Sequence, residues 1–87
     1  MAYVYVLQSV KNGRYYIGSS NDLERRLLEH NSGKTASIKY LLPVKLVFNK
    51  KCLSLQDARK LELKLKKLKS RSILDKIVRD GNIKMGL

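Results

Sequence analysis

The chain has 87 residues, and its 19 Lys and Arg against 7 Asp and Glu give a formal net charge of +12. This length predicts a single domain over residues 1–87, because domains usually need about 100 residues. The positive charge favours a polyanionic partner such as nucleic acid. The single cysteine, Cys52, excludes an internal disulfide and a multi-cysteine zinc site. This cysteine usage fits a reduced, cytoplasmic setting. With no apolar run long enough to cross a bilayer, we expect no membrane partner.

The first predicted elements are two strands joined by a hairpin. Residues 2–8 are rich in Tyr and Val and are typical of a strand that is covered on both faces. The pair Asn12-Gly13 predicts a two-residue turn, because both residues tolerate positive φ. The return strand is expected over residues 14–18.

The predicted turn also sets the register of the two strands. Without a bulge, Ser9 would lie opposite Tyr16. Because side chains alternate with a period of two, Tyr5 and Tyr16 would then share one face of the sheet.

A helix is predicted over residues 22–30. Asn21 is its expected N-cap, and Glu24 would complete a capping box. At 100° per residue, one third of the helix surface holds Leu23, Arg26, Leu27 and His30. A surface helix normally keeps charge on its water side, so Arg26 and His30 among leucines indicate a structural partner or a function.

The second half of the chain predicts one strand and two helices. A basic loop over residues 34–43 contains Lys34, Lys39 and Tyr40, and an alternating strand follows at 44–50. Helices are expected at 55–68, capped by Ser54, and at 71–79. The order ββαβαα predicts an α+β domain in which helices pack on a small three-stranded antiparallel or mixed sheet.

Glu62 is unusual within the helix at 55–68, because it projects inside the arc formed by the apolar residues. It is the only acidic residue between Arg59 and Leu74. Phosphodiester hydrolysis could use a carboxylate for a divalent cation, a positive group for the transition state and an acid or base. The candidates for these roles are Tyr5, Tyr16, Arg26, His30 and Glu62.

Each candidate also has a structural interpretation. The two tyrosines could be core aromatics, and His30 could be favoured near a helix C-terminus by the helix dipole. Arg26 and Glu62 could form a buried ion pair that joins two helices.

Four segments resemble the GIY-YIG nuclease family. YVYVL at 3–7 is similar to the first signature, with Tyr3 in place of its Gly, and YIG at 16–18 matches the second. SSNDLERRLLEHNSGK continues in the family's register, and ARKLELKLKKLK resembles its late helix with the glutamate. The resemblance covers residues 2 to about 79, and it is to the small single-domain branch related to the nuclease module of excision-repair proteins.

The resemblance implies a role for each candidate residue. Tyr5 and Tyr16 would be the signature tyrosines, Arg26 the transition-state arginine and His30 the helix histidine. Glu62 would hold one Mg²⁺ (or Mn²⁺), with water filling most of the coordination shell. Either Tyr16 or His30 would activate water. Some family members carry a late Asn near the site, and Asn82 is the available residue here.

The function expected from this resemblance is a metal-dependent endonuclease acting on DNA. We expect it to recognise branched or damaged duplex by shape, in DNA repair or recombination, because a small domain has little room for base readout. The alternative is a noncatalytic nucleic-acid-binding module, in which Glu62 only pairs with Arg26. Membrane attachment through ARKLELKLKKLK ranks last, since this helix has no Trp or Phe to insert.

Overall fold

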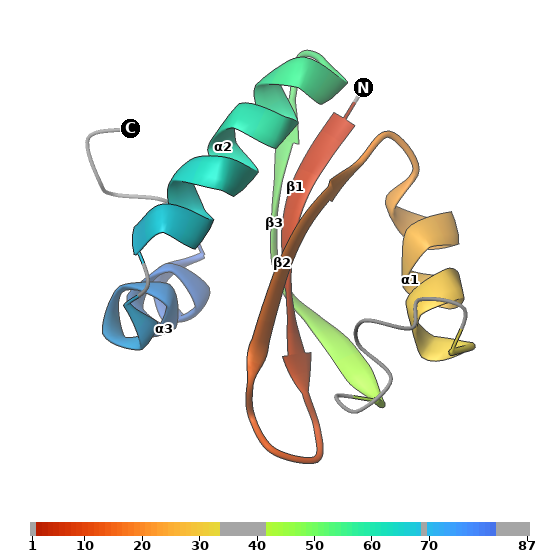
Figure 1. Cartoon of the computed structure of the whole chain (residues 1–87), viewed down its shortest axis with the longest axis vertical. Helices are drawn as coiled ribbons and strands as arrows, with labels where there is room; N and C mark the ends of the chain where they lie inside the picture. Colours follow the sequence, from red (N-terminus) through yellow and green to blue (C-terminus); the bar gives the residue numbers. More distant parts are fainter. Residues whose placement is uncertain (1, 34–41, 69, 82–87) are drawn as a thin grey trace.

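The computed structural model describes residues 2–33, 42–68 and 70–81, and Figure 1 shows the chain. The basic loop residues Lys34, Lys39 and Tyr40, and also Asn82, lie outside these ranges. The order ββαβαα and the α+β class are confirmed. The elements are β1 (Ala2–Ser9), β2 (Tyr15–Ser20), α1 (Leu23–Asn31), β3 (Val44–Cys52), α2 (Leu55–Leu68) and α3 (Arg71–Asp80).

The three strands form an antiparallel sheet in the order β2-β1-β3, so β1 is the central strand. Helix α1 covers one face of the sheet, whereas α2 and α3 cover the other (Figure 1). Val4 and Val6 are fully buried, as expected for a strand with both faces covered. None of the helices in the described ranges is long and apolar enough to span a membrane.

The alternation of side chains along β1 divides the core into two clusters. Val4 and Val6 point toward α2 and α3, where they pack with Phe48, Leu65 and Ile77. The neighbouring residues face the other way and pack under α1; this second cluster contains Tyr5, Leu7, Val44, Leu23 and Leu27.

The predicted hairpin register is wrong by two residues. The N–H of Ser9 donates to the carbonyl oxygen of Arg14 at 2.8 Å, so the loop has four residues, 10–13. Tyr16 therefore lies opposite Leu7 and not opposite Ser9. The Ser9 hydroxyl stabilises this longer turn, because its oxygen accepts hydrogen bonds from the N–H groups of Lys11 (3.1 Å) and Asn12 (3.2 Å).

A shift of two residues preserves the alternation of faces. Tyr5 and Leu7 point to the same side of β1, and Tyr16 lies opposite Leu7. The prediction that Tyr5 and Tyr16 share one face of the sheet is therefore confirmed.

The start of α1 also differs from the prediction. Asp22 is the N-cap, and its Oδ1 accepts from the N–H of Arg25 at 3.2 Å. Asn21 therefore lies one residue before the cap, in a turn where the Ser20 hydroxyl accepts from the N–H of Asp22 at 3.0 Å. The cap of α2 is as predicted, since Ser54 Oγ accepts from the N–H of Asp57 at 3.1 Å.

Candidate active site

Three aromatic rings meet between α1 and the sheet. The Tyr5 hydroxyl lies 3.0 Å from Nε2 of His30, and both side chains are almost completely buried. The rings of Tyr16 and His30 pack edge to face, with their centroids 5.3 Å apart. The predicted face of α1 is correct, since it turns His30 inward beside Leu23 and Leu27.

Gly18 allows the Tyr5 ring to lie across β2. The two residues are paired in the sheet, and a Cβ built on Gly18 would stand 2.5 Å from the Tyr5 hydroxyl oxygen. Any side chain at this position would push the phenol away from His30. The sequence signature contained this glycine, but its role depends on the strand pairing.

Burial raises the pKa of the Tyr5 phenol above its usual value. The nearby guanidinium of Arg26 acts in the opposite direction, while Tyr16 and Glu62 add to the increase. Tyr5 therefore keeps its proton at neutral pH, and it is a hydrogen-bonding group there and not a base.

Burial lowers the pKa of His30, and the charge of Arg26 lowers it further, against the smaller effect of Glu29. The ring is therefore neutral at neutral pH. Its buried Nδ1 has no hydrogen-bond partner among the described residues. Because a buried N–H without a partner is rarer than an unpaired acceptor, we assign the hydrogen to Nε2, which donates to the Tyr5 oxygen. This leaves the Tyr5 hydroxyl hydrogen available to another acceptor.

Arg26 and Glu62 do not pair with each other in the structure. Arg26 Nη1 lies 3.8 Å from Glu29 Oε1, and the Arg26 side chain is 36% exposed. Glu62 Oε1 accepts from the Ser19 hydroxyl at 2.5 Å, and Lys66 Nζ lies 2.6 Å from Glu62 Oε2. The interpretation of Arg26 and Glu62 as a helix-joining ion pair is therefore wrong.

The contact of Ser19 with Glu62 was missed from the sequence. Because side chains alternate along β2, Ser19 and Gly18 point to opposite faces of the sheet. Ser19 points to the face that α2 covers. The sequence predicts the alternation of side chains along β2, but it does not predict that α2 lies beside β2.

The predicted site residues lie on opposite faces of the sheet. Tyr5, Tyr16 and His30 lie on the face covered by α1, whereas Glu62 lies on the face covered by α2. Helices α1 and α2 lie on the two sides of the edge strand β2 (Figure 1). A groove of about 240 Å³ lies at the end of this strand. It is lined by Ser19, Ser20, Asn21, Arg25, Arg26, Leu55 and Arg59. Three guanidinium groups and two hydroxyls suit a phosphate group, which they can contact through charge-assisted hydrogen bonds. We call this the edge groove.

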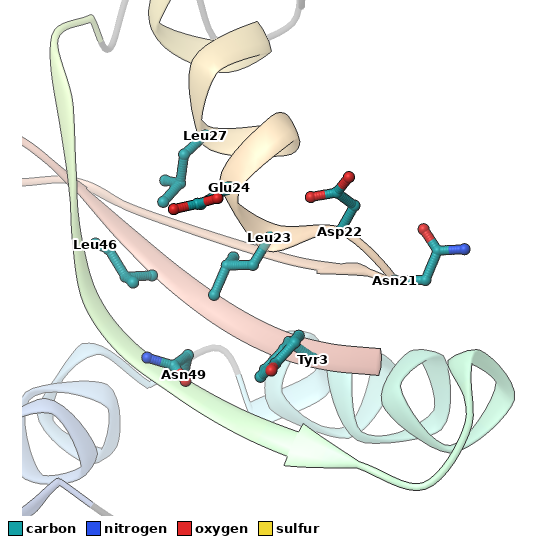
Figure 2. A pocket seen from close by; sticks show the side chains of 8 residues that line it. All are labelled: Tyr3, Asn21, Asp22, Leu23, Glu24, Leu27, Leu46 and Asn49. Carbon is teal, nitrogen blue, oxygen red and sulfur yellow. The ribbon is translucent and has the colours of Figure 1, made fainter. Parts of the chain in front are cut away.

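A larger groove of about 480 Å³ lies between α1 and strands β1 and β3 (Figure 2). Leu23, Leu27 and Leu46 point into it, and among the described residues that line it only Asp22 and Glu24 are charged. These carboxylates would repel a phosphate backbone. The smaller edge groove is therefore the better candidate for nucleic acid.

Glu62 is a single carboxylate, and no group of three or more His, Cys, Asp or Glu side chains gathers within the described ranges. Mg²⁺ is commonly bound by one or two carboxylates together with water and substrate phosphates. The Glu62 carboxylate, held in place by Ser19 beside a groove suited to phosphate, fits this pattern.

The family of the chain follows from comparison with known proteins. The model of the GIY-YIG catalytic domain matches residues 1–75. The chain belongs to the GIY-YIG family, which implies a nuclease-type function. The resemblance predicted from the sequence is therefore confirmed.

Several relatives carry the name UPF0213. A UPF0213 protein of Streptococcus pneumoniae serotype 4 is 45% identical over 69 residues, which are 78% of this chain and 69% of that protein. One from Streptococcus pyogenes serotype M3 is 42% identical over 72 residues, covering 82% and 77% of the two chains. The solution NMR structure of the UPF0213 protein BH0048 from Bacillus halodurans is similar with a TM-score of 0.56 and 34% identity, covering 93% of this chain and 87% of that one.

Proposed function

We propose that this chain is a metal-dependent endonuclease that hydrolyses phosphodiester bonds of DNA. The observation that carries the proposal is the edge groove, which brings together arginines from two helices. One lining residue, Arg26, acts by its charge on Tyr5 and His30, and another, Ser19, donates to Glu62. A phosphate bound there would contact groups from both faces of the sheet.

Arg26 is the proposed transition-state residue. Its partly exposed side chain lines the edge groove, and its charge acts on both Tyr5 and His30. A guanidinium in this position can stabilise the negative charge that develops on the phosphoryl oxygens.

Tyr16 is the proposed general base. His30 is completely buried and its Nε2 contacts Tyr5, which supports a role in holding the phenol and not in contacting water. Tyr16 is partly exposed and would take a proton from the attacking water while the bond to the leaving oxygen breaks. For this step the Tyr16 oxygen must carry the negative charge of a phenolate, a form that nearby positive charge favours. Tyr5 keeps its proton and is as deeply buried as His30, so we give it a positioning role and not a contact with the phosphate.

Glu62 is the proposed ligand of Mg²⁺ or Mn²⁺, and the Ser19 hydroxyl orients its carboxylate. When bound, such an ion supplies Lewis-acid stabilisation of charge on the phosphoryl and leaving oxygens.

The proposed substrate is branched or damaged duplex DNA, in cytoplasmic repair or recombination. Guanidinium and hydroxyl contacts to phosphates fix the position of a duplex without reading its sequence. The edge groove is lined by such groups, which supports binding that does not depend on base sequence, as expected of an enzyme that selects its substrate by shape.

The test is incubation of the purified protein with linear, flapped and four-way-junction DNA, with Mg²⁺ or with a chelator. The proposal predicts nicking that requires the metal and is faster on branched DNA. Binding of all three substrates without nicking would instead support a noncatalytic nucleic-acid-binding module.

A further inference from the structure

Both carboxylate oxygens of Glu62 are engaged by the protein itself. The Ser19 hydroxyl donates to Oε1 at 2.5 Å, and Lys66 Nζ lies 2.6 Å from Oε2. Lys66 follows Glu62 by one helical turn on α2, so its ammonium reaches the carboxylate without leaving the helix surface. Within the chain, Glu62 therefore already has a cation as its partner.

The two ends of this ion pair differ in exposure. The Glu62 side chain is only 17% exposed and is fixed by Ser19, whereas the Lys66 side chain is 48% exposed. An exposed lysine can leave such a pair easily, because water solvates its ammonium. Glu62 has no comparable freedom to move.

We propose that Lys66 is an internal competitor for the metal position on Glu62, and that it sets the affinity of the site for divalent cations. This inference rests on the proposed function, in which Glu62 binds Mg²⁺ or Mn²⁺. An ion bound to Oε2 would lie within about 5 Å of the ammonium, where two positive charges repel. Lys66 must therefore move away before the ion binds.

The test uses Lys66→Met, which keeps the length of the side chain and its helix propensity but removes the charge. Mn²⁺ is titrated into ¹⁵N-labelled protein without DNA, and paramagnetic broadening of the Ser19 and Glu62 amide signals gives the dissociation constant. The proposal predicts that Lys66→Met lowers this constant at least about threefold, since both the competing pair and the repulsion are lost. Lys66→Arg, which keeps the charge, should stay near the wild-type value.

The matched control is Lys64→Met. Lys64 is exposed on the same helix, two residues from Glu62 and hence on another side of it. It carries the same charge, so its removal measures the general effect of net charge on metal affinity. The proposal predicts a clearly smaller change for Lys64→Met than for Lys66→Met.

The outcomes separate this inference from the proposed function. Suppose that Mn²⁺ broadens the two signals in the wild type, but both Met variants change the dissociation constant equally or not at all. The proposal that Lys66 competes with the metal is then wrong, whereas the assignment of Glu62 as the metal ligand stands. If Mn²⁺ broadens neither signal in any variant, the metal assignment to Glu62 and the competition both fail. Circular dichroism of each variant checks that α2 is intact.

Discussion

The phenol ring of Tyr5 lies across Gly18 of the neighbouring strand, so closely that a Cβ on Gly18 would stand 2.5 Å from the Tyr5 hydroxyl oxygen. Tyr5 is 1% exposed, and its hydroxyl contacts His30 at 3.0 Å. The ring therefore cannot yield without losing this contact.

Gly18→Ala should destabilise the protein by about 1–3 kcal/mol through overpacking. Chemical denaturation measures this loss. A double-mutant cycle with Tyr5→Ala provides the control, because the added methyl group then has space and should cost much less. An equal cost in both backgrounds would mean that the close approach of Tyr5 is not the cause.

Because of His30, the stability of the protein should decrease as the pH is lowered through a defined range. Its pKa is lowered in the folded protein by burial, so the unfolded chain binds a proton first as the pH falls. Stability should be constant above the ordinary histidine value of about 6.5 and decrease below it, until the lowered folded pKa is reached. His30 is the only histidine, so thermal melting from pH 7 to about 5.5 follows mainly this residue, below the α-amino titration and above most carboxyl titrations. In His30→Phe the decrease should disappear; if it remains unchanged, another group causes it.

Tyr5→Phe should cost more stability than Tyr15→Phe. Removing the Tyr5 hydroxyl leaves the buried Nε2 of His30 without a partner, at a cost of about 1–3 kcal/mol. The Tyr15 hydroxyl donates a hydrogen bond to Asp75 at an exposed position, so water can replace the Tyr15 hydroxyl there. Urea denaturation of both variants compares the two costs. Equal losses would argue against the buried hydrogen bond as a main determinant of stability.

Much of this arrangement could be predicted from the sequence because it depends on local periodicity. The period of two along β1 and β2 placed Tyr5 and Tyr16 on one face, and the helical period of α1 added His30 to them. The turn was mispredicted because the Ser9 side chain stabilises a longer loop than Asn12-Gly13 alone suggests.

The partners of Glu62 could not be predicted in the same way. Its position inside the apolar arc of α2 suggested a long-range partner, and Arg26 was an available cation. The actual contact with Ser19 depends on α2 lying beside β2, which is a tertiary relationship. The edge groove was missed for the same reason, since it combines residues of α1, α2 and β2.

Arg26→Ala should affect cleavage more than binding. Its guanidinium would meet charge that develops only in the transition state, so the single-turnover rate on bound DNA should fall about 10²- to 10³-fold. Arg25→Ala is the matched control, because Arg25 also lines the edge groove and pairs with Glu29 at 2.9 Å. This control should weaken binding and leave the rate on bound DNA nearly unchanged. If Arg26→Ala instead behaves like Arg25→Ala, Arg26 only anchors the DNA.

The most direct test of the account is Glu62→Gln, with melting, DNA binding and nicking measured on one preparation. Gln keeps an oxygen that can accept from Ser19, and the lost pair with the exposed Lys66 should cost only about 0.5 kcal/mol. We predict that the variant folds and binds DNA at least as well as the wild type, because one repulsive negative charge is gone, but loses metal-dependent nicking. A folded variant that still nicks DNA with Mg²⁺ at the wild-type rate would contradict the assignment of Glu62 as the metal ligand, and with it the proposed mechanism.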